Sequence, residues 1–368
     1  MRSTFAEINL SNLRYNYLLI RRKTKRKVMV VVKANAYGHG VIPVVEALNK
    51  LGLKRPEYYG VALTEEAIEI RQKSKIDQPI LTFSPFCKDE INEYYKYGIL
   101  PSICSKREIR NLNSLKLRKK LYVQINVDTG MGRLGLQFDE AENLIKKISL
   151  NKNIVIDGIY THFATSDEFD KTFANLQLKR FINLLNKLKS SRIRLGIVHA
   201  ANSGAILDLP DSYFDMVRPG ISLYGYFPSM ETSESLDLKP VMYIKSKVST
   251  IKKIRTKESV SYGRKFIANK DTKVATLPIG YADGISRGLS NKMKIIIKDK
   301  LYNQVGRVTM DRISVDIENA NVKVGDNVII LGKSKKYKID AWDWAKQLNT
   351  IPYEITCNIS SRVPRVYR

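Results

Sequence analysis

The chain has 368 residues, of which 43% are hydrophobic and 27% are charged. That length and apolar fraction are enough for a large core divided between two domains, so we do not expect a disordered chain. No apolar run is long enough to cross a bilayer, and the first 25 residues lack the pattern of a signal peptide. We therefore expect a cytoplasmic protein with no membrane segment.

The formal net charge of +27 raises the question of a nucleic-acid partner. The densest basic run, RRKTKRK, covers residues 21–27 and follows the amphipathic segment SNLRYNYLLI. We expect this run in the last turn of a helix, where cations interact favourably with the helix dipole. No zinc-finger, RRM or helix-turn-helix pattern accompanies it, so we expect no nucleic-acid partner.

Three cysteines, Cys87, Cys104 and Cys357, are odd in number and share no close metal-ligand spacing. A disulfide framework and a structural metal site are therefore both poorly supported. We expect the three thiols to serve as small buried hydrophobic groups, and we expect no metal.

From residue 27 to about 225, short apolar runs alternate with charged segments of helical period. The helical patterns include IPVVEALNK, EEAIEIRQK, KDEINEYYK, SKREIRNLN, FDEAENLIKKI and LQLKRFINLLNKLK. Eight strand-then-helix units predict a parallel (β/α)8 barrel of the TIM type. An open doubly wound sheet is the alternative, but no strand is followed by G-x-G-x-x-G. The expected strands are 27–33, 58–64, 79–83, 99–104, 121–128, 154–162, 194–200 and 214–218.

The pattern changes after Tyr226, where the polar segment SMETSESLDLK and then Pro240 indicate a domain junction. The remainder is rich in β-type runs such as KVATLPIG, KIIIKD, RISVDI and NVIIL, and only DAWDWAKQLNT has helical character. We expect a barrel domain over 1–235 and a mainly antiparallel β domain over 236–368. The first strand-like residues, STFAEINL, are expected to pack on the second domain.

A lysine ends the first expected strand, in the stretch VVKANAYGHG at residues 31–40. Burial of an ammonium group is costly unless the group is paired or deprotonated, so Lys33 is a candidate for imine formation. A single lysine at a strand end more often extends into solvent. The assignment therefore depends on the residues around it.

Polar segments also follow later strands, at the barrel end where catalytic groups and phosphate sites are found. VDTGMGRLG follows the fifth strand, YTHFATSDE closes the sixth, HAANSGA follows the seventh and VRPGISLYG the eighth. All three histidines of the chain lie in such segments: His39, His162 and His199.

These segments resemble the motifs of the alanine racemase family, in order and over nearly the whole chain. The second domain continues the resemblance with VSYG, IGYADGISR, GRVTMDRIS and IPYEITC. The resemblance implies an enzyme that interconverts L- and D-alanine through an external aldimine of pyridoxal 5'-phosphate. It also implies a homodimer with composite active sites that supplies D-alanine for peptidoglycan synthesis.

The resemblance assigns roles to individual residues. Lys33 would hold the cofactor and act as the base on one face, and Tyr262 of the partner subunit would act on the other, with His162 as its hydrogen-bond partner. Arg218, bonded to His199, would face the pyridine nitrogen. The remaining cofactor residues would be Tyr37, Arg133, His162, Asn202, Ser203, Gly220, Ile221 and Tyr353. Arg133, Met310 and Tyr281 would contact substrate, and an access corridor would be lined by Asp167, Arg287, Arg307, Asp311 and Ile351.

One position departs from the family pattern. Many members carry, seven residues before the arginine of GMGRLG, a carbamylated lysine whose negative charge orients that arginine. Here the position is Asn126, and a neutral amide cannot replace the anion. We hypothesise a bound chloride beside Asn126 and Arg133.

Other functions stay open at this point. A non-catalytic pyridoxal-phosphate-binding protein would resemble only the barrel, and the motifs of the second domain argue against it. A decarboxylase of the same architecture would use a carboxylate at the pyridine nitrogen, where this chain has Arg218. A serine racemase or a racemase of broad specificity is a closer alternative, because packing distinguishes a methyl from a hydroxymethyl group by only about 1–3 kcal/mol.

Overall fold

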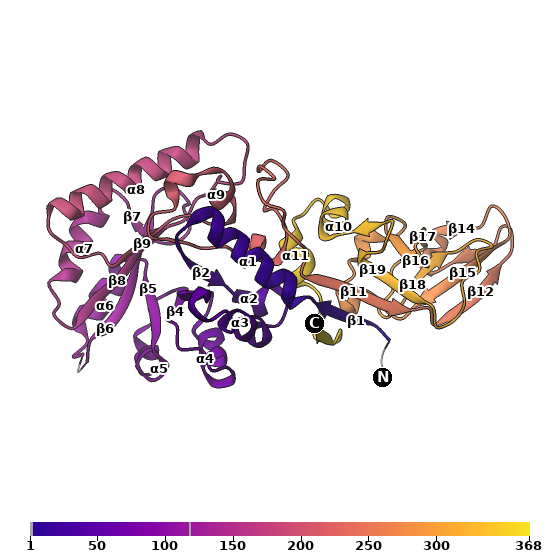
Figure 1. Ribbon diagram of the computed structural model, residues 1–368, viewed down its shortest axis with the longest axis horizontal. Coiled ribbons are helices and arrows are strands. Elements are labelled where there is room, and N and C mark those ends of the chain that lie inside the picture. Colours follow the sequence, from indigo (N-terminus) through magenta and orange to yellow (C-terminus); the bar gives the residue numbers. More distant parts are fainter. Residues whose placement is uncertain (1–2, 118) are drawn as a thin grey trace.

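The computed structural model describes residues 3–117 and 119–368. Figure 1 shows two masses along the long axis of the molecule, one in the indigo-to-magenta part of the chain and the other in the orange-to-yellow part. The C-terminus lies where the two masses meet (Figure 1).

The first mass is the expected parallel barrel. Its strands follow the order β5-β4-β3-β2-β10-β9-β8-β6, and pairing of β5 with β6 closes the ring. All eight expected strands are present, so the predicted fold is confirmed. They are β2 Lys27–Val31, β3 Tyr58–Val61, β4 Ile80–Pro85, β5 Ile99–Ile103, β6 Leu121–Asp128, β8 Ile154–Thr161, β9 Ile197–His199 and β10 Met216–Val217. The short β7, Leu136–Gln137, pairs with β6 beside the ring.

Helices follow seven of the strands, but the eighth unit differs from the prediction. Only the 3-10 helix η4, Ile221–Tyr224, follows β10. It ends at Gly225, whose φ is 92° and whose missing Cβ would lie 2.1 Å from the Lys239 carbonyl oxygen. Helix α1, Leu10–Thr24, packs against η4 and α3 and so covers this part of the barrel. The others are α3 Val41–Asn49, α4 Thr64–Lys73, α5 Ile91–Tyr97, α6 Lys106–Ser114, α7 Ala141–Ser149, α8 Thr172–Ser190 and α9 Ser203–Asp208.

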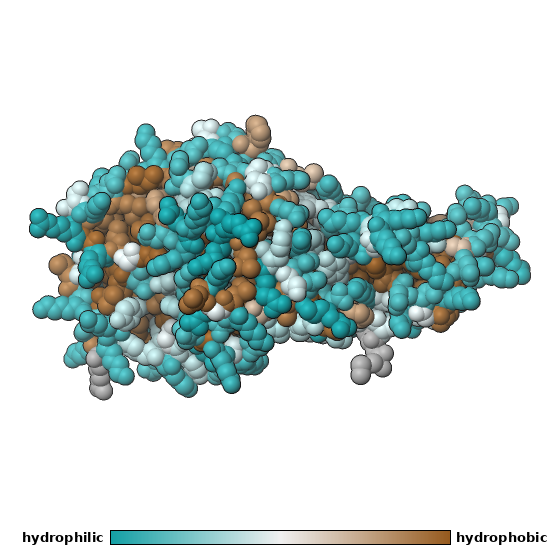
Figure 2. Space-filling view, viewed as in Figure 1, coloured by the Kyte–Doolittle hydropathy of each residue, from teal (hydrophilic) through white to brown (hydrophobic). Residues whose placement is uncertain are grey.

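The basic run lies where the sequence predicted. Arg21, Arg22 and Lys23 form the last turn of α1, and Lys25 ends the helix in the left-handed conformation. Arg21 is paired with Glu57 through two hydrogen bonds of 2.9 and 2.7 Å. Figure 2 shows a face of the molecule on which hydrophilic side chains predominate over both masses. Within the described ranges, no helix is long and apolar enough to cross a membrane.

The second mass is a mostly antiparallel sheet in the order β12-β15-β18-β17-β16-β19-β11-β1-β21. The N-terminal strand β1 pairs antiparallel with β11 and parallel with β21, which confirms that STFAEINL packs on this sheet. Helices α10, Ala341–Leu348, and α11, Pro352–Cys357, lie in the chain between β20 and β21. The strands are β1 Phe5–Ile8, β11 Met242–Lys247, β12 Thr250–Ile254, β15 Thr272–Leu277, β16 Lys294–Ile297, β17 Lys300–Val305, β18 Ile313–Asp316, β19 Asn327–Lys333, β20 Lys338–Ile339, which pairs with β19, and β21 Arg365–Tyr367; a separate hairpin is formed by β13 Ser259–Val260 and β14 Phe266–Ile267.

The end of the chain returns to the barrel mouth. Helix α11 contacts the segment Lys33–Tyr37, labelled α2. A Cβ on Gly38 would lie 2.2 Å from the Thr356 carbonyl oxygen, and Arg365 Nε donates to the Gly38 carbonyl at 3.1 Å. The C-terminal segment therefore holds the lysine stretch in place.

The cysteine prediction is only partly right. Cys104 is buried, but Cys87 is half-buried and Cys357 is exposed. Cys357 is the last residue of α11, whose buried side is formed by Pro352, Ile355 and Thr356. Its thiol therefore does not take part in the core.

Candidate active site

The candidate lysine lies in an unusual backbone segment. The strand β2 ends at Val31, two residues earlier than expected, and Ala34 to Tyr37 all have φ between 51° and 54°. A left-handed turn costs L-residues roughly 1–2 kcal/mol each, so surrounding contacts must stabilise it. The Ala34 N–H donates to Glu66 Oε1 at 2.6 Å, and Asn35 Oδ1 accepts from the Val41 N–H at 2.8 Å.

His39 also holds this turn from inside the protein. Its Nδ1 lies 3.0 and 2.9 Å from the carbonyl oxygens of Ala36 and Tyr37, and its ring stacks on Tyr224 with the centroids 4.5 Å apart. Carbonyl oxygens only accept, so Nδ1 carries the proton. Complete burial lowers the pKa of His39 to about 4.

This low pKa predicts an acid-sensitive fold. Between pH 6.5 and about pH 4 the unfolded chain binds a proton at His39 that the folded chain excludes. The stabilisation is complete above pH 6.5 and is lost as the pH falls, by up to about 3 kcal/mol at roughly 1.4 kcal/mol per pH unit. The free energy of unfolding, measured by urea denaturation at pH 7 and pH 4.5, should fall less in His39→Asn than in the wild type. The asparagine keeps a hydrogen-bond donor but does not titrate. Equal losses in the two proteins would contradict this assignment.

A pocket of about 420 Å³ opens at the carboxyl ends of the barrel strands. It gathers most of the residues that the sequence predicted for the cofactor, although they come from widely separated segments. These are Lys33, Tyr37, Arg133, His162, Asn202, Ser203, Arg218, Gly220 and Tyr353. Asn126 lines the same pocket, and Ile221 is buried directly after Gly220.

One end of the pocket is built for an anion. Ser203 Oγ accepts from the N–H groups of Gly220 at 3.0 Å and Ser222 at 3.3 Å, which leaves its own hydroxyl hydrogen available. A Cβ on Gly220 would lie 2.6 Å from the Tyr37 hydroxyl, so the glycine keeps this space open. Ile221 begins η4, where a backbone N–H has no intrahelical acceptor. Hydroxyl and backbone donors of this kind suit a phosphate group.

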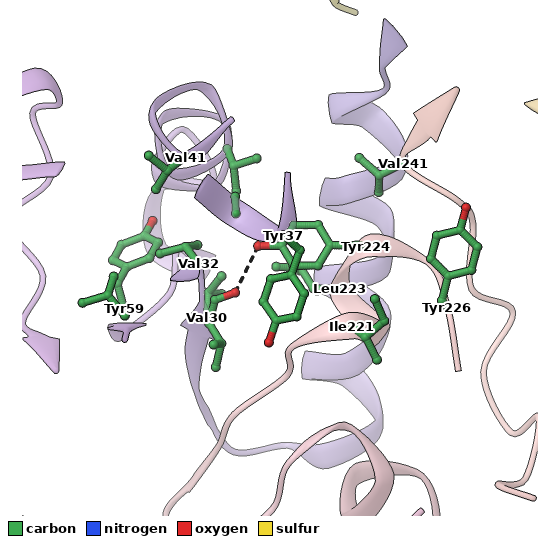
Figure 3. Packing of buried hydrophobic residues seen from close by; sticks show 14 of the residues in the cluster. Val30, Val32, Tyr37, Val41, Tyr59, Ile221, Leu223, Tyr224, Tyr226 and Val241 are labelled. Atoms are coloured by element: carbon green, nitrogen blue, oxygen red, sulfur yellow. Dashed lines mark hydrogen bonds between the residues drawn. The ribbon is translucent and has the colours of Figure 1, made fainter. Parts of the chain in front are cut away.

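Aromatic packing fixes the phenol at this end. The centroid of the Tyr37 ring lies 4.8 Å from that of Tyr224 and 5.8 Å from that of Tyr353. Figure 3 shows the Tyr37 and Tyr224 rings side by side. The Tyr224 hydroxyl donates to the Val31 carbonyl at 3.0 Å, which ties the ring to the end of β2 (Figure 3). Burial raises the pKa of Tyr37 far above 10, so its hydroxyl stays protonated and can donate.

Arg218 forms another wall of the pocket and is only 3% exposed. Its Nη1 donates to His199 Nδ1 at 2.8 Å, and its Nη2 donates to the carbonyl oxygens of Thr161 at 2.7 Å and Ala200 at 2.9 Å. Burial lowers the pKa of Arg218 to about 10, which still leaves the guanidinium charged at neutral pH. Its Nε has no acceptor among the described residues, so one donor remains available.

Positive charge and burial together act on Lys33. Burial lowers the pKa of Lys33 first, the charge of Arg133 lowers it further, and Glu66 opposes both effects. His162, in the same pocket, has its pKa lowered to about 3 by burial and by Arg218, so it is neutral. A lysine with a lowered pKa offers a larger fraction of free amine for nucleophilic or base chemistry.

Arg133 lies in a loop that the end of β6 holds in place. Asp128 accepts from the N–H groups of Gly130 and Gly132, at 2.8 and 3.0 Å at their shortest. Across the described ranges, the Arg133 side chain has no hydrogen bond or ion pair to protein. The Asn126 amide instead points its Nδ2 at Cys104 Sγ, 3.8 Å away.

Three predicted site residues lie elsewhere. Tyr262, Tyr281 and Met310 line a separate hollow of about 900 Å³ in the second mass, and their side chains are 73%, 43% and 52% exposed. Tyr262 stands between β13 and β14, at the tip of their hairpin. Three corridor residues, Arg287, Arg307 and Asp311, line the same hollow, whereas Asp167 and Ile351 line neither pocket.

Two residues of the site carried no clear sequence signal. Tyr160 lines the pocket and shares a hydrogen bond of 2.8 Å with Ser102, although in the sequence it is an ordinary tyrosine near the end of an apolar run. Glu66 accepts from the N–H groups of Ala34 and Ala62, but in the sequence it is one of two adjacent glutamates in an ordinary charged helix. The tertiary contact alone distinguishes it.

The fold and the pocket define a class of protein. It is a (β/α)8 barrel with an attached β domain, in which a lysine after the first barrel strand lines one pocket together with hydroxyl and backbone donors and a buried arginine. The family models for the N-terminal and C-terminal domains of alanine racemase match residues 8–228 and 241–367. The chain belongs to the alanine racemase family.

Individual relatives match over the whole chain. It is 43% identical to "Alanine racemase 2" of Caldanaerobacter subterraneus subsp. tengcongensis, covering 100% of this chain and 95% of that protein. It is 40% identical to the alanine racemase of Carboxydothermus hydrogenoformans, with both proteins covered completely. The solved alanine racemase of Clostridium difficile 630 superposes with a TM-score of 0.92 at 38% identity, covering 100% of this chain and 96% of that one. The solved alanine racemase of Bacillus anthracis with bound L-Ala-P superposes with a TM-score of 0.91 at 30% identity, covering 100% of this chain and 95% of that one.

Proposed function

We propose that this protein is a pyridoxal-phosphate-dependent racemase that interconverts L- and D-alanine. The observation that carries the proposal is the pocket of about 420 Å³ that Lys33 lines together with Arg218 and with the donors around Ser203. The names of the relatives support alanine as the substrate. The enzyme would work in the cytoplasm and supply D-alanine for peptidoglycan synthesis.

The donors in the pocket fit the cofactor. Tyr37, Ser203, Gly220, Ile221 and Tyr353 would hold its phosphate. The three hydroxyl groups and the Ile221 N–H would donate to it, and Gly220, whose N–H is bonded to Ser203 Oγ, would leave room for it. Residues around the rest of the pocket would hold its ring: Arg133, His162, Asn202 and Arg218. When bound, pyridoxal phosphate supplies the electron sink that makes the Cα proton of an amino acid removable.

Inversion at Cα requires a proton acceptor on each face of the substrate. Lys33 is the acceptor in the barrel pocket, where burial and Arg133 favour its neutral amine. Tyr262 of the partner subunit is the proposed group on the other face. After one group has removed the proton, the opposite group donates its own, so each direction of the reaction uses both residues.

Arg218 separates this chemistry from that of other enzymes with the same cofactor. A guanidinium only donates hydrogen bonds, so its free Nε cannot accept one from a protonated ring nitrogen. A carboxylate in its place would keep that nitrogen protonated. With the cofactor bound, Arg218 would therefore weaken the ring as an electron sink and disfavour transamination.

The exposed hollow of the second mass supports a homodimer with composite active sites. Tyr262, Tyr281 and Met310 are large side chains that stay accessible in one chain and lie outside the lysine pocket. We propose that the domain formed by residues 236–368 places these side chains at the mouth of the partner's pocket, above the barrel domain of residues 1–235. Met310 would then offer its N–H to the substrate carboxylate with Arg133, and Tyr281 would narrow the access route.

Activity is tested with the cofactor-loaded protein in deuterium oxide. L-Alanine should lose its optical rotation and exchange its Cα proton, whereas a binding protein without catalysis would do neither. L-Serine in the same preparation measures substrate breadth, and some turnover is expected because one hydroxyl changes packing energy by only about 1–3 kcal/mol. Release of carbon dioxide would instead indicate a decarboxylase.

The unpaired Arg133 predicts a dependence on chloride. We propose that a chloride ion beside Asn126 supplies the negative charge that orients this arginine. Raising chloride at constant ionic strength should lower KM for alanine, and Asn126→Asp, which carries its own charge, should remove the dependence. Identical chloride responses in the two proteins, or none in the wild type, would contradict the proposal.

A further inference from the structure

A chain of hydrogen-bonded polar side chains runs from Arg218 through the barrel interior to the half-buried Asp157. Arg218 Nη1 donates to His199 Nδ1 at 2.8 Å, and His199 Nε2 lies 2.8 Å from Gln124 Oε1. Gln124 Nε2 donates to Asp157 Oδ2 at 2.9 Å. His199 and Gln124 have no exposed surface, so water cannot substitute for either partner.

The two ends of this hydrogen-bonded chain, Arg218 and Asp157, determine where the protons lie on the residues between them. The Asp157 carboxylate only accepts, so the Gln124 amide must present its NH2 group to Asp157 and its oxygen to His199. The guanidinium of Arg218 only donates, so His199 must present a lone pair at Nδ1. Both constraints require the same neutral tautomer of His199, with its proton on Nε2.

The surrounding groups keep this arrangement rigid. The Tyr160 ring is stacked on the His199 ring with their planes 13° apart, and its hydroxyl is bonded to Ser102. On the far side, the Tyr58 hydroxyl donates to Asp157 at 3.3 Å. The members come from strands β3, β6, β8 and β9 and the residue after β10, so closure of the barrel brings them together.

We infer that Gln124 and Asp157 are positioning residues that fix the plane of Arg218 through His199 and thereby aim its free Nε into the pocket. Neither residue lines the pocket, and each acts only through the next side chain. The inference rests on the proposed function, because it assigns Arg218 to the ring nitrogen of the cofactor. It extends the site from the pocket surface to the base of the barrel interior.

Nuclear magnetic resonance of the cofactor-free protein tests the chain without any turnover. With only three histidines in the sequence, ¹⁵N-labelled imidazoles can be assigned by substitution. His199 should show the neutral Nε2–H tautomer, with a hydrogen-bonded proton that exchanges slowly. Gln124→Met should speed that exchange and move the proton signal upfield. An unchanged signal in Gln124→Met, or an Nδ1–H tautomer in the wild type, would overturn the inference.

Kinetics and the cofactor spectrum test the consequence for Arg218. Gln124→Met should lower kcat by about 10- to 100-fold, a usual effect of removing an outer hydrogen-bond partner, with a smaller change in KM. It should also shift the visible absorption of bound pyridoxal phosphate, which senses the ring nitrogen. Asp157→Ala should lower kcat similarly, because the Gln124 amide is then free to flip. Asp157→Asn keeps an acceptor oxygen and should lower kcat less.

A matched control separates positioning from general destabilisation. Gln78 is another buried glutamine, 5% exposed, whose Nε2 donates to Asn49 Oδ1 outside this chain. Gln78→Met should leave the His199 signal and the cofactor spectrum unchanged. Equal losses of kcat in the two glutamine variants, or no loss in Gln124→Met, would overturn the inference. Absence of racemisation in the wild type would instead count against the proposed function, and the His199 signal would still decide on the chain of hydrogen bonds.

Discussion

Replacing Lys33 with alanine should lower racemisation by about 10⁴-fold or more in both directions. The variant loses both the amine that binds the cofactor and one of the two proton-transferring groups, and removal of a covalent catalytic residue has effects of this size. Lys33→Arg keeps the positive charge next to Glu66 but offers no free amine, so it should be equally inactive. Stopped assays starting from each enantiomer measure the loss.

The site of attachment can be tested independently of rate. Borohydride reduction of the cofactor-loaded wild type, followed by peptide mapping, should place the pyridoxyl label on Lys33. The left-handed turn supports this choice, because Lys33, at its start, lines the pocket. A label on any other lysine would refute the assignment.

Tyr262→Phe should lower racemisation by roughly 10²- to 10⁴-fold, the usual contribution of one general acid or base. The loss should affect both directions, since inversion in either direction needs both proton-transferring groups. Exchange of the Cα proton with deuterium oxide should survive for only one enantiomer, the one whose proton faces Lys33. Undiminished racemisation in both directions would contradict the two-base proposal.

A control variant and a mixing experiment locate Tyr262 in the dimer. Tyr337→Phe alters another exposed tyrosine of the second domain, 38% exposed and outside the hollow, and should retain activity. When Lys33→Ala and Tyr262→Phe proteins are unfolded together and refolded as a 1:1 mixture, half of the dimers are mixed. Each mixed dimer has one complete site if the two residues act across the interface, so about a quarter of wild-type activity should return. No recovery would indicate that both residues act within one chain.

The sequence predicted the architecture because local patterns repeat. Each barrel strand is a short apolar run, and each following helix has an amphipathic period, so the eight strands could be placed to within a few residues. The prediction of a helix after the eighth strand was wrong, because η4 ends after one turn at Gly225. Helix α1, from the beginning of the chain, covers the place where that helix would have packed. Replacement of one helix by another depends on packing between segments that are distant in the sequence, and the periodicity of a single segment does not predict it.

The sequence by itself determined the barrel, the lysine after its first strand and the residue types of the site, because each of these is encoded in a short contiguous segment. The tertiary structure decided the left-handed turn that presents Lys33, the contact of Glu66 with that turn, and the polar chain from Arg218 through His199 and Gln124 to Asp157. The reason is physical. Hydrogen bonds between residues as distant in sequence as Gln124 and His199 form only when the sheet places their strands, β6 and β9, on either side of β8. The cost of the positive φ angles is met only by contacts from other elements.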